Sequence, residues 1–285
     1  MTEFDAAMAL TQTDEAGVFT GRLDHVWTIG PAVNGGVLMG LAAQALSQVL
    51  GSGEMPHADP YALSAHFLSA GEHGDVTVAT EVIRRGRSIS TGQASLRQLG
   101  RDGAPVERMR ALATYGDLAS AEQVHRTLEP PSMPGPEECV SSSSMRSGGP
   151  IEAPPLMHRL DLRLDPSTAG WAVGKPSGRG EMLAWIRFAD GREADPISLL
   201  FFLDAMPPVS FDLGIPGWAP TLEFSGHVRG RPAPGWLQMR TTSSILSGSL
   251  MEEEAVIWDL TGRVVAQSRQ LCRVRLPEGW SAPGA

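Results

Sequence analysis

The stretch Ser64-Ala65-His66-Phe67 is matched 161 residues later by Ser225-Gly226-His227-Val228, and this repetition decides how the chain is organised. At the same spacing Gly74 corresponds to Gly235, so a glycine follows each histidine by eight residues. A repeat of so long a period indicates a duplicated domain and not a solenoid, whose units are far shorter.

Each half of the sequence has the pattern of one helix followed by strands. In the first half, apolar residues recur at helical spacing between Asn34, a suitable N-cap, and Gly51. In the second half, Asp195 and Pro196 suit the N-cap and the first helical position, and Pro207-Pro208 ends the helix. The predicted strands cover residues 18–29, 62–68, 76–83, 88–98, 106–114, 158–164, 182–188, 222–229, 237–242, 250–259 and 264–274. This order predicts an α+β fold in which each half packs one helix against an antiparallel sheet.

The region between the two halves has a different composition. Residues 119–154 are rich in Ser, Pro, Gly and Glu and lose the apolar periodicity, which is typical of a linker. We therefore expect an N-terminal domain at residues 1–118, a linker at 119–154 and a C-terminal domain at 155–285.

Composition excludes several classes of protein. The 285 residues are 42% hydrophobic and 19% charged, which excludes disorder for most of the chain. The net charge of −9 argues against a nucleic-acid partner, because binding to phosphates needs a basic face. The sequence begins without a signal segment, has no apolar run long enough for a bilayer, and holds only two cysteines, Cys139 and Cys272. We expect a cytoplasmic protein that binds neither nucleic acid nor membrane.

Several common catalytic signatures are missing. The sequence has no G-x-S-x-G nucleophile elbow and no G-x-G-x-x-G after a predicted strand. Its seven histidines and two cysteines show no metal-ligand spacing. We therefore expect no metal and no nucleotide cofactor.

The helix of the second half carries one charge within an apolar run. From Ile197 to Met206 it is apolar on all sides, which is typical of a buried helix, and Asp204 is its only charged residue. A buried carboxylate must be paired, hydrogen-bonded or shifted to a higher pKa. A role in a site or a hydrogen-bond network is therefore favoured over a solvated aspartate on the last turn.

The last predicted strand carries one large polar group on its inner face. Alternation places Gln270 on the same face as small, mostly apolar residues, and a buried amide needs partners. A site role and a core glutamine bonded to the backbone both remain open for Gln270. Thr221 precedes the strand 222–229, and strict alternation places it off the apolar face, so the residues alone favour no site role for it.

These features together resemble the double hot-dog acyl-CoA thioesterases, the type II bacterial enzymes and their peroxisomal relatives. The resemblance runs from about residue 27 to 274 and rests on an ordered set of stretches. These are Ser64-Ala-His-Phe-Leu-Ser-Ala-Gly, Arg84-Arg-Gly-Arg-Ser-Ile-Ser, Trp185-Ile-Arg, Leu203-Asp204 and Val265-Ala-Gln-Ser-Arg-Gln270. The resemblance implies two tandem hot-dog domains, each an antiparallel sheet wrapped round a central helix, and hydrolysis of fatty acyl-CoA to fatty acid and CoA.

The resemblance also implies which residues are catalytic. Members of the family that this chain resembles activate water with an Asp, a Thr and a Gln in the C-terminal domain. The resemblance places these residues at Asp204, Thr221 and Gln270. The corresponding residues of the first half are Ala43, Pro60 and Ala111, whose side chains can neither transfer a proton nor form a hydrogen bond. We therefore expect one active site per chain. The helix N-terminus near Asn34-Gly35-Gly36 is a candidate for stabilising the oxyanion.

Two alternatives stay open. A hydratase or dehydratase of the same architecture typically pairs its Asp with a His five residues later, where this chain has Val209. A non-catalytic protein that binds acyl-CoA or an acyl chain would have the same pocket. The arginines between Arg84 and Arg110 are either a solvated sheet face or a landing site for the phosphates of CoA. Further association into a homo-oligomer is expected from the family.

Overall fold

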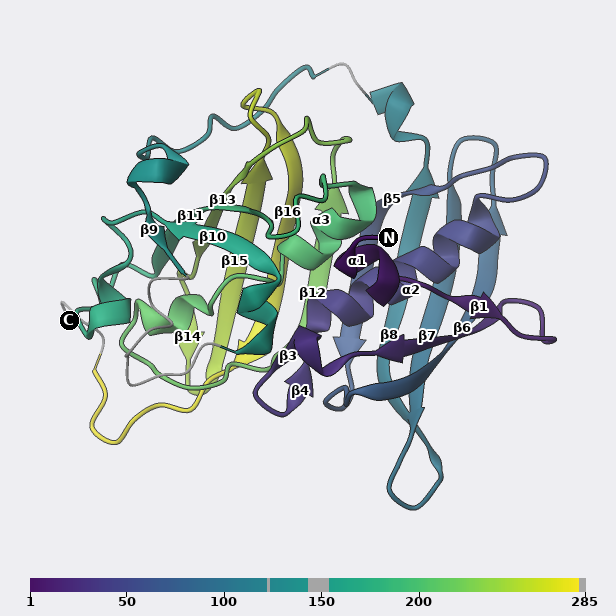
Figure 1. Cartoon of the computed structure of the whole chain (residues 1–285), viewed down its shortest axis with the longest axis horizontal. Coiled ribbons are helices and arrows are strands. Elements are labelled where there is room, and N and C mark those ends of the chain that lie inside the picture. The colour runs from purple at the N-terminus through teal and green to yellow at the C-terminus, as the bar shows by residue number, and fades with distance from the viewer. Residues whose placement is uncertain (122–123, 143–153, 282–285) are drawn as a thin grey trace.

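In this computed structural model residues 1–121, 124–142 and 154–281 are described. Within these ranges one 14-stranded antiparallel sheet curves around the helices, as Figure 1 shows. Its strands follow the order β1-β2-β6-β7-β8-β5-β12-β16-β15-β13-β11-β10-β9, with β14 paired to β15, and β3 and β4 form a separate pair.

The bounds of the elements agree closely with the predicted pattern. The helices are α1 (Glu3–Ala7), α2 (Gly35–Leu50) and α3 (Pro196–Phe202). The strands of the first half are β1 (Thr11–Gln12), β2 (Val18–Leu23), β3 (Thr28–Ile29), β4 (Ala32–Val33), β5 (Asp59–Phe67), β6 (Gly74–Arg85), β7 (Ser90–Leu99) and β8 (Pro105–Gly116). Those of the second half are β9 (Val140–Ser141), β10 (Leu160–Leu164), β11 (Glu181–Phe188), β12 (Thr221–Val228), β13 (Leu237–Thr242), β14 (Leu246–Ser247), β15 (Leu250–Trp258) and β16 (Val264–Arg273).

Two predicted elements end well before their predicted boundary. The strand predicted at 18–29 ends at Leu23, because the Asp24 side chain accepts a hydrogen bond from the Val26 N–H and caps a short 3₁₀ turn. The second helix ends at Phe202, and the backbone turns through Leu203 before it reaches the two prolines. Asp204 therefore lies immediately beyond α3 and not within its last turn.

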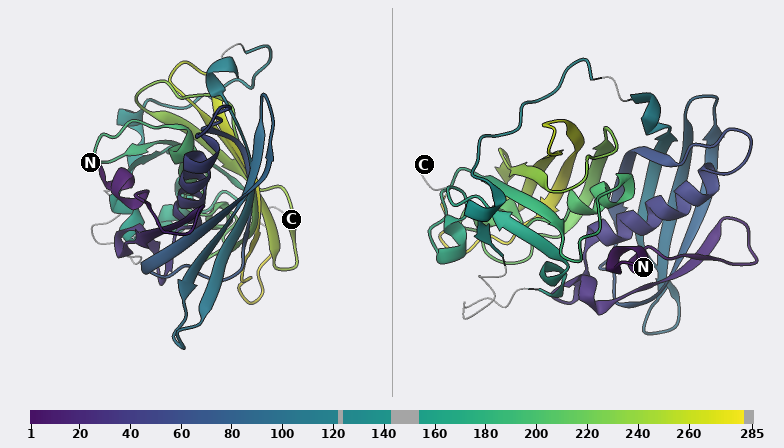
Figure 2. Two further views of the ribbon diagram at one scale, coloured as in Figure 1. Left: turned by 90° about the vertical axis from the view of Figure 1, so that its right-hand side faces the viewer. Right: turned by 45° about the horizontal axis from the view of Figure 1, so that its top comes forward.

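The concave face of the sheet holds α2 and α3, as the two views of Figure 2 show. Helix α2 is 16 residues long and buried along most of its length. Helix α3 has 7 residues and starts with a capping box between Asp195 and Ser198. Phe201 of α3 contacts Phe4 of α1 and Trp27, with ring centroids 5.3 and 5.5 Å apart. These aromatic contacts connect the N-terminal segment to the helix of the second half.

The two halves join through the pairing of β5 with β12. Ser64 lies opposite Ser225, with their hydroxyl oxygens 3.3 Å apart, and Ala65 lies opposite Phe224. The two serines are the equivalent residues of the repeated stretches. An antiparallel pair centred on equivalent residues is the arrangement that two copies related by a twofold axis would produce.

Part of the predicted linker is ordered against the second half. Strand β9 pairs with β10, and the indole N–H of Trp185 donates to the Pro134 carbonyl oxygen at 2.8 Å. The side-chain amide of Gln238 donates to the Pro131 carbonyl oxygen at 2.6 Å. Residues 122–123 and 143–153 of the predicted linker lie outside the described residues. No helix in the described ranges has the length and apolar character needed to cross a membrane.

Candidate active site

Asp204 lies where the second half meets the N-terminus of α2. Its Oδ2 accepts hydrogen bonds from the Gly36 backbone N–H at 2.8 Å and from Asn34 Nδ2 at 3.0 Å. Asn34 Nδ2 also lies 2.8 Å from the Asp204 carbonyl oxygen, while Asn34 Oδ1 caps the helix by accepting from the Val37 N–H. The carboxylate thus sits at the positive end of the long helix, which stabilises a negative charge.

This approach requires glycine at the start of α2. A Cβ on Gly36 would lie 2.7 Å from the Phe201 carbonyl oxygen, closer than real Cβ contacts allow. A Cβ on Gly35 would lie 3.0 Å from Asp204 Oδ2 and 2.9 Å from the Phe67 ring. Side chains at either position would push the Asp204 segment away from the helix N-terminus.

Burial sets the acidity of Asp204. Desolvation raises its pKa from 3.8 to about 7, against the opposing effect of the hydrogen bonds from Gly36 and Asn34. Leu203 and Ala205 are fully buried, whereas Asp204 keeps partial exposure. A carboxyl group with a pKa near neutrality and some access to solvent is suited to act as a general base on water.

Thr221 and Gln270 are in direct contact. Thr221 is the first residue of β12, and its hydroxyl donates to Gln270 Oε1 on β16 at 2.6 Å. Strict alternation predicted that Thr221 points away from the inner face, and this was wrong. A β-bulge at Leu222 lets Thr221 pair with the inward-facing Cys272, and the extra residue turns the threonine inward.

A third polar side chain extends this pair, and the sequence interpretation missed it. Glu253 on β15 lies directly opposite Gln270, is 5% exposed, and accepts a hydrogen bond from Gln270 Nε2 at 2.8 Å. Its other oxygen accepts from the Val209 backbone N–H at 2.8 Å. The alternation of side chains along β15 could have identified it in the sequence, because Met251, Glu253 and Ala255 share the inner face and only Glu253 is charged.

Asp204 is not hydrogen-bonded to the network of Thr221, Gln270 and Glu253, but its charge affects the ionisation of Glu253. Among the described residues, Asp204 makes no direct hydrogen bond to Thr221 or Gln270. Burial, together with a smaller effect of the Asp204 charge, raises the pKa of Glu253 to about 7 against the opposing effect of the hydrogen bonds from Val209 and Gln270. Burial, followed by the charges of Glu253 and Asp204, raises the pKa of the Cys272 thiol to about 12. The site therefore combines a buried carboxyl group, Glu253, with a partly buried one, Asp204, and the charge of each disfavours ionisation of the other.

The arginines between Arg84 and Arg110 are partly used within the fold. Arg85 donates to three carbonyl oxygens at the C-terminal end of α2, at 2.6 to 3.3 Å. Arg108 is buried and bonds Gln98, and Arg110 pairs with Glu107 at 2.6 Å. Since these three guanidinium groups have protein partners, the exposed Arg84, Arg87 and Arg101 are the better candidates for a phosphate.

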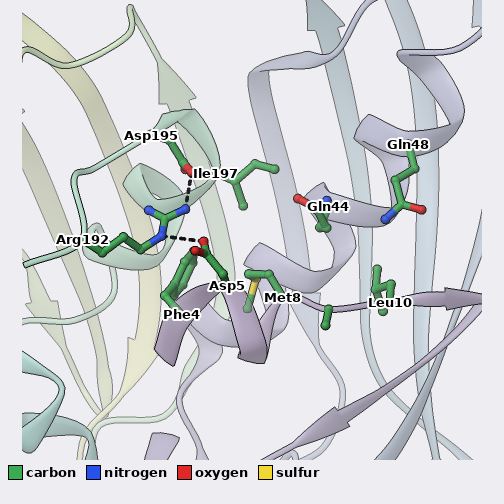
Figure 3. Close-up of a pocket in the computed structure, with 10 residues that line it drawn as sticks. Phe4, Asp5, Met8, Leu10, Gln44, Gln48, Arg192, Asp195 and Ile197 are labelled. Atoms are coloured by element: carbon green, nitrogen blue, oxygen red, sulfur yellow. Dashed lines mark hydrogen bonds and ion pairs between the residues drawn. The ribbon is translucent and has the colours of Figure 1, made fainter. Parts of the chain in front are cut away.

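A hollow of about 320 Å³ lies beside the C-terminal half of α2, and Figure 3 shows its lining. Gln44 and Gln48 face it from α2, and Arg192 faces it from the second half. The Arg192 guanidinium is held by the carboxylates of Asp5 and Asp195. This hollow is therefore distinct from the helix N-terminus where Asp204 lies. Within the described ranges, no group of His, Cys, Asp and Glu side chains is arranged to hold a metal ion.

Comparison with known proteins agrees with this architecture. The family model for the N-terminal domain of acyl-CoA thioesterases matches residues 23–116, and the model for the C-terminal domain matches residues 136–274. An uncharacterised protein of Mycobacterium tuberculosis is 31% identical over 95% of this chain and 98% of its own length.

Two solved structures superpose on nearly the whole chain. A Thermobifida fusca protein assigned as a thioesterase II superposes with a TM-score of 0.84 and 29% identity, covering 97% of this chain and 98% of that one. A hot-dog protein of Alicyclobacillus acidocaldarius has a TM-score of 0.80 at 19% identity, covering 97% and 99%. The second likeness shows that the fold is of the hot-dog type. On the two matched domain models, the chain belongs to the acyl-CoA thioesterase family.

Proposed function

We propose that this protein is a thioester hydrolase that converts fatty acyl-CoA to free fatty acid and CoA. Family membership supports the reaction class. The observation that carries the proposal is the carboxyl group of Asp204, partly buried at a helix N-terminus with a pKa of about 7. Such a group is largely ionised at slightly alkaline pH and is a far stronger base than an ordinary aspartate.

In the proposed reaction, Asp204 removes a proton from a water molecule while the water oxygen bonds to the thioester carbonyl carbon. Thr221 and Gln270 hold this water in line with the carbonyl carbon. The tetrahedral intermediate then breaks its carbon–sulfur bond, and the proton passes from Asp204 to the sulfur of CoA. No covalent intermediate with the protein is formed.

A backbone amide is available for the oxyanion. The Gly36 N–H is engaged by Asp204, but the Gly35 N–H, in the same first turn of α2, has no acceptor among the described residues. The geometry favours Gly35 over Gly36 as the donor to the developing negative charge. This supports the role expected of the Asn34-Gly35-Gly36 stretch.

We also propose that the family's double hot-dog arrangement holds here. The N-terminal unit covers residues 1–118, the linker 119–154, and the C-terminal unit, with the catalytic residues Asp204, Thr221 and Gln270, covers 155–285. The separate matches of the two domain models and the pairing of Ser64 with Ser225 support this division. We expect the protein to work in the cytoplasm on acyl-CoA substrates without a metal or other cofactor.

The alternative is a protein of the same fold that binds acyl-CoA or an acyl chain without hydrolysing it. Purified protein is incubated with acyl-CoAs of increasing chain length and a reagent that reports free thiol, and binding is measured separately by calorimetry. We expect steady catalytic release of CoA, well beyond one equivalent per protein and without an initial burst. Binding of acyl-CoA without release of thiol, for every chain length, would favour the alternative.

A further inference from the structure

Glu253 lies on the buried face of β15, where the alternation of side chains predicts an apolar residue. Its neighbours on the inner face of β15, Met251 and Ala255, are buried, and Glu253 itself is 5% exposed. An unpaired buried carboxyl group costs several kcal/mol, so its partners define what it does there. Those partners are the Gln270 amide and the backbone N–H of Val209.

These partners fix the direction of each hydrogen bond. An ionised carboxylate only accepts, so the NH₂ group of Gln270 must face Glu253 Oε1, at 2.8 Å. The carbonyl oxygen of the same amide then faces Thr221, and the threonine hydroxyl must donate to it, at 2.6 Å. With its only proton committed, Thr221 Oγ1 can offer lone pairs alone to any further partner.

The second contact of Glu253 reaches the segment that follows Asp204. Val209 lies five residues after Asp204, past Pro207 and Pro208, and its N–H donates to Glu253 Oε2 at 2.8 Å. One carboxylate therefore holds both the Gln270 amide and the chain that leaves the proposed base.

We propose that Glu253 is a positioning residue that fixes the Gln270 amide in one orientation and thereby makes Thr221 a hydrogen-bond acceptor toward the reacting water. A water that donates to Thr221 and gives its other proton to Asp204 has a lone pair free to attack the thioester carbonyl. This inference rests on the proposed function and adds to it a residue outside the expected trio of Asp, Thr and Gln.

The orientation depends on the charge of Glu253. A protonated Glu253 can donate to Gln270, which lets the amide turn over so that its NH₂ faces Thr221 and frees the threonine proton. The titratable groups around Glu253 are Asp204 beyond α3, Glu252 on the same strand and Cys272 on β16. Burial and the charges of both carboxylates raise the pKa of Glu253 to about 7. The productive orientation is therefore present above about pH 7 and is lost as the pH falls.

The first test replaces Glu253 with its neutral isostere and measures kinetics on an acyl-CoA that the wild type hydrolyses. In Glu253→Gln, the new amide satisfies Val209 with its oxygen and turns its NH₂ toward Gln270, which reverses the network. We expect kcat to fall between about 10-fold and about 100-fold, with KM within about a factor of 2, because positioning and not binding is lost. Glu254→Gln, the same change at the next, exposed position, is the matched control and should keep kcat.

A second readout does not depend on turnover. The side-chain amide resonances of Gln270 are followed by ¹⁵N–¹H NMR in the wild type and both variants. We expect them to move upfield in Glu253→Gln, where the carboxylate acceptor is gone, and to stay in place in Glu254→Gln. If the wild type hydrolyses no acyl-CoA, the proposed function fails, while unmoved Gln270 resonances would overturn the positioning role by themselves.

The third variant removes only one hydrogen bond to Glu253. Val209 is the first residue of a 3₁₀ turn, a position that accepts proline, so Val209→Pro deletes the N–H donor without a change of charge. Loss of a donor to a carboxylate raises its pKa, so the acid limb of kcat should shift to higher pH in this variant. A wild-type pH profile in Val209→Pro together with unchanged kcat in Glu253→Gln would overturn the proposal.

Discussion

Replacing Asp204 by asparagine should make the folded protein more stable at alkaline pH while it removes the proposed base. The folded state holds this carboxyl group with a pKa of about 7 because it is buried, whereas the unfolded chain has the ordinary value of 3.8. Between these values the folded state binds more protons than the unfolded state, so stability falls as the pH rises. At about 1.4 kcal/mol per pH unit, the full cost above pH 7 is about 4 kcal/mol.

Asparagine avoids this cost and keeps the local contacts. Its side-chain oxygen can accept the hydrogen bonds that Gly36 and Asn34 donate to Asp204 Oδ2. Removal of the charge also relieves Glu253, whose pKa is raised by Asp204, and this acts in the same direction. We therefore expect the free energy of unfolding of Asp204→Asn to exceed that of the wild type by about 4 kcal/mol at pH 8.5 and by about 2 kcal/mol at pH 5.

Urea unfolding at the two pH values measures the difference. Asp14→Asn makes the same chemical change at an exposed residue and should leave the free energy of unfolding within about 0.5 kcal/mol of the wild type. The raised pKa of Asp204 is refuted if Asp204→Asn is no more stable than the wild type at pH 8.5. It is also refuted if the variant gains the same free energy of unfolding at both pH values, because ionisation of Asp204 then does not destabilise the folded state.

Three further predictions concern the residues around this site. Gly36→Ala should destabilise the protein by about 1 to 3 kcal/mol and lower kcat, because a Cβ would lie 2.7 Å from the Phe201 carbonyl oxygen. Thermal unfolding and acyl-CoA turnover measure the two losses, and wild-type values in both would contradict the close approach. Thr221→Val should lower kcat by about 10-fold to about 100-fold with little change of fold, as checked by turnover and circular dichroism, and full activity would exclude the hydroxyl from the reaction. Asp195→Ala removes the capping box of α3 and should cost about 0.5 to 2 kcal/mol in urea unfolding, whereas an unchanged urea midpoint would mean that neighbouring packing alone holds the helix.

The sequence was sufficient for the two central helices, the long strands and their order, but not for the short elements α1, β1, β4, β9 and β14. Apolar spacing and the caps at Asn34 and Asp195 located both central helices, because helix signals are local. The repeated serines indicated a duplication, and the structure places Ser64 directly opposite Ser225. Two boundaries differed most: the strand that begins at Val18 ends before the side-chain cap of Asp24, and α3 ends at Phe202, before the last apolar residues of its run.

The site was only partly predictable, since its contacts join residues far apart in the chain. The apolar run around Asp204 indicated a perturbed carboxyl group, but nothing local indicated that Asn34 and Gly36, about 170 residues earlier, would bind it. The orientation of Thr221 depends on a one-residue bulge, which alternation cannot show. Glu253 is visible in the sequence as a charge on an inner face, but its partners, Gln270 and Val209, lie on segments far from it in the chain.

The central claim is that Asp204 activates water for thioester hydrolysis, and the rate of CoA release by Asp204→Asn tests it most directly. With a saturating acyl-CoA at pH 8 and the Asp14→Asn variant as control, we expect the loss of a general base to lower kcat by about 100-fold to about 10,000-fold. The folded state of the variant is verified by its unfolding transition. A folded Asp204→Asn protein that releases CoA at the wild-type rate would contradict the account.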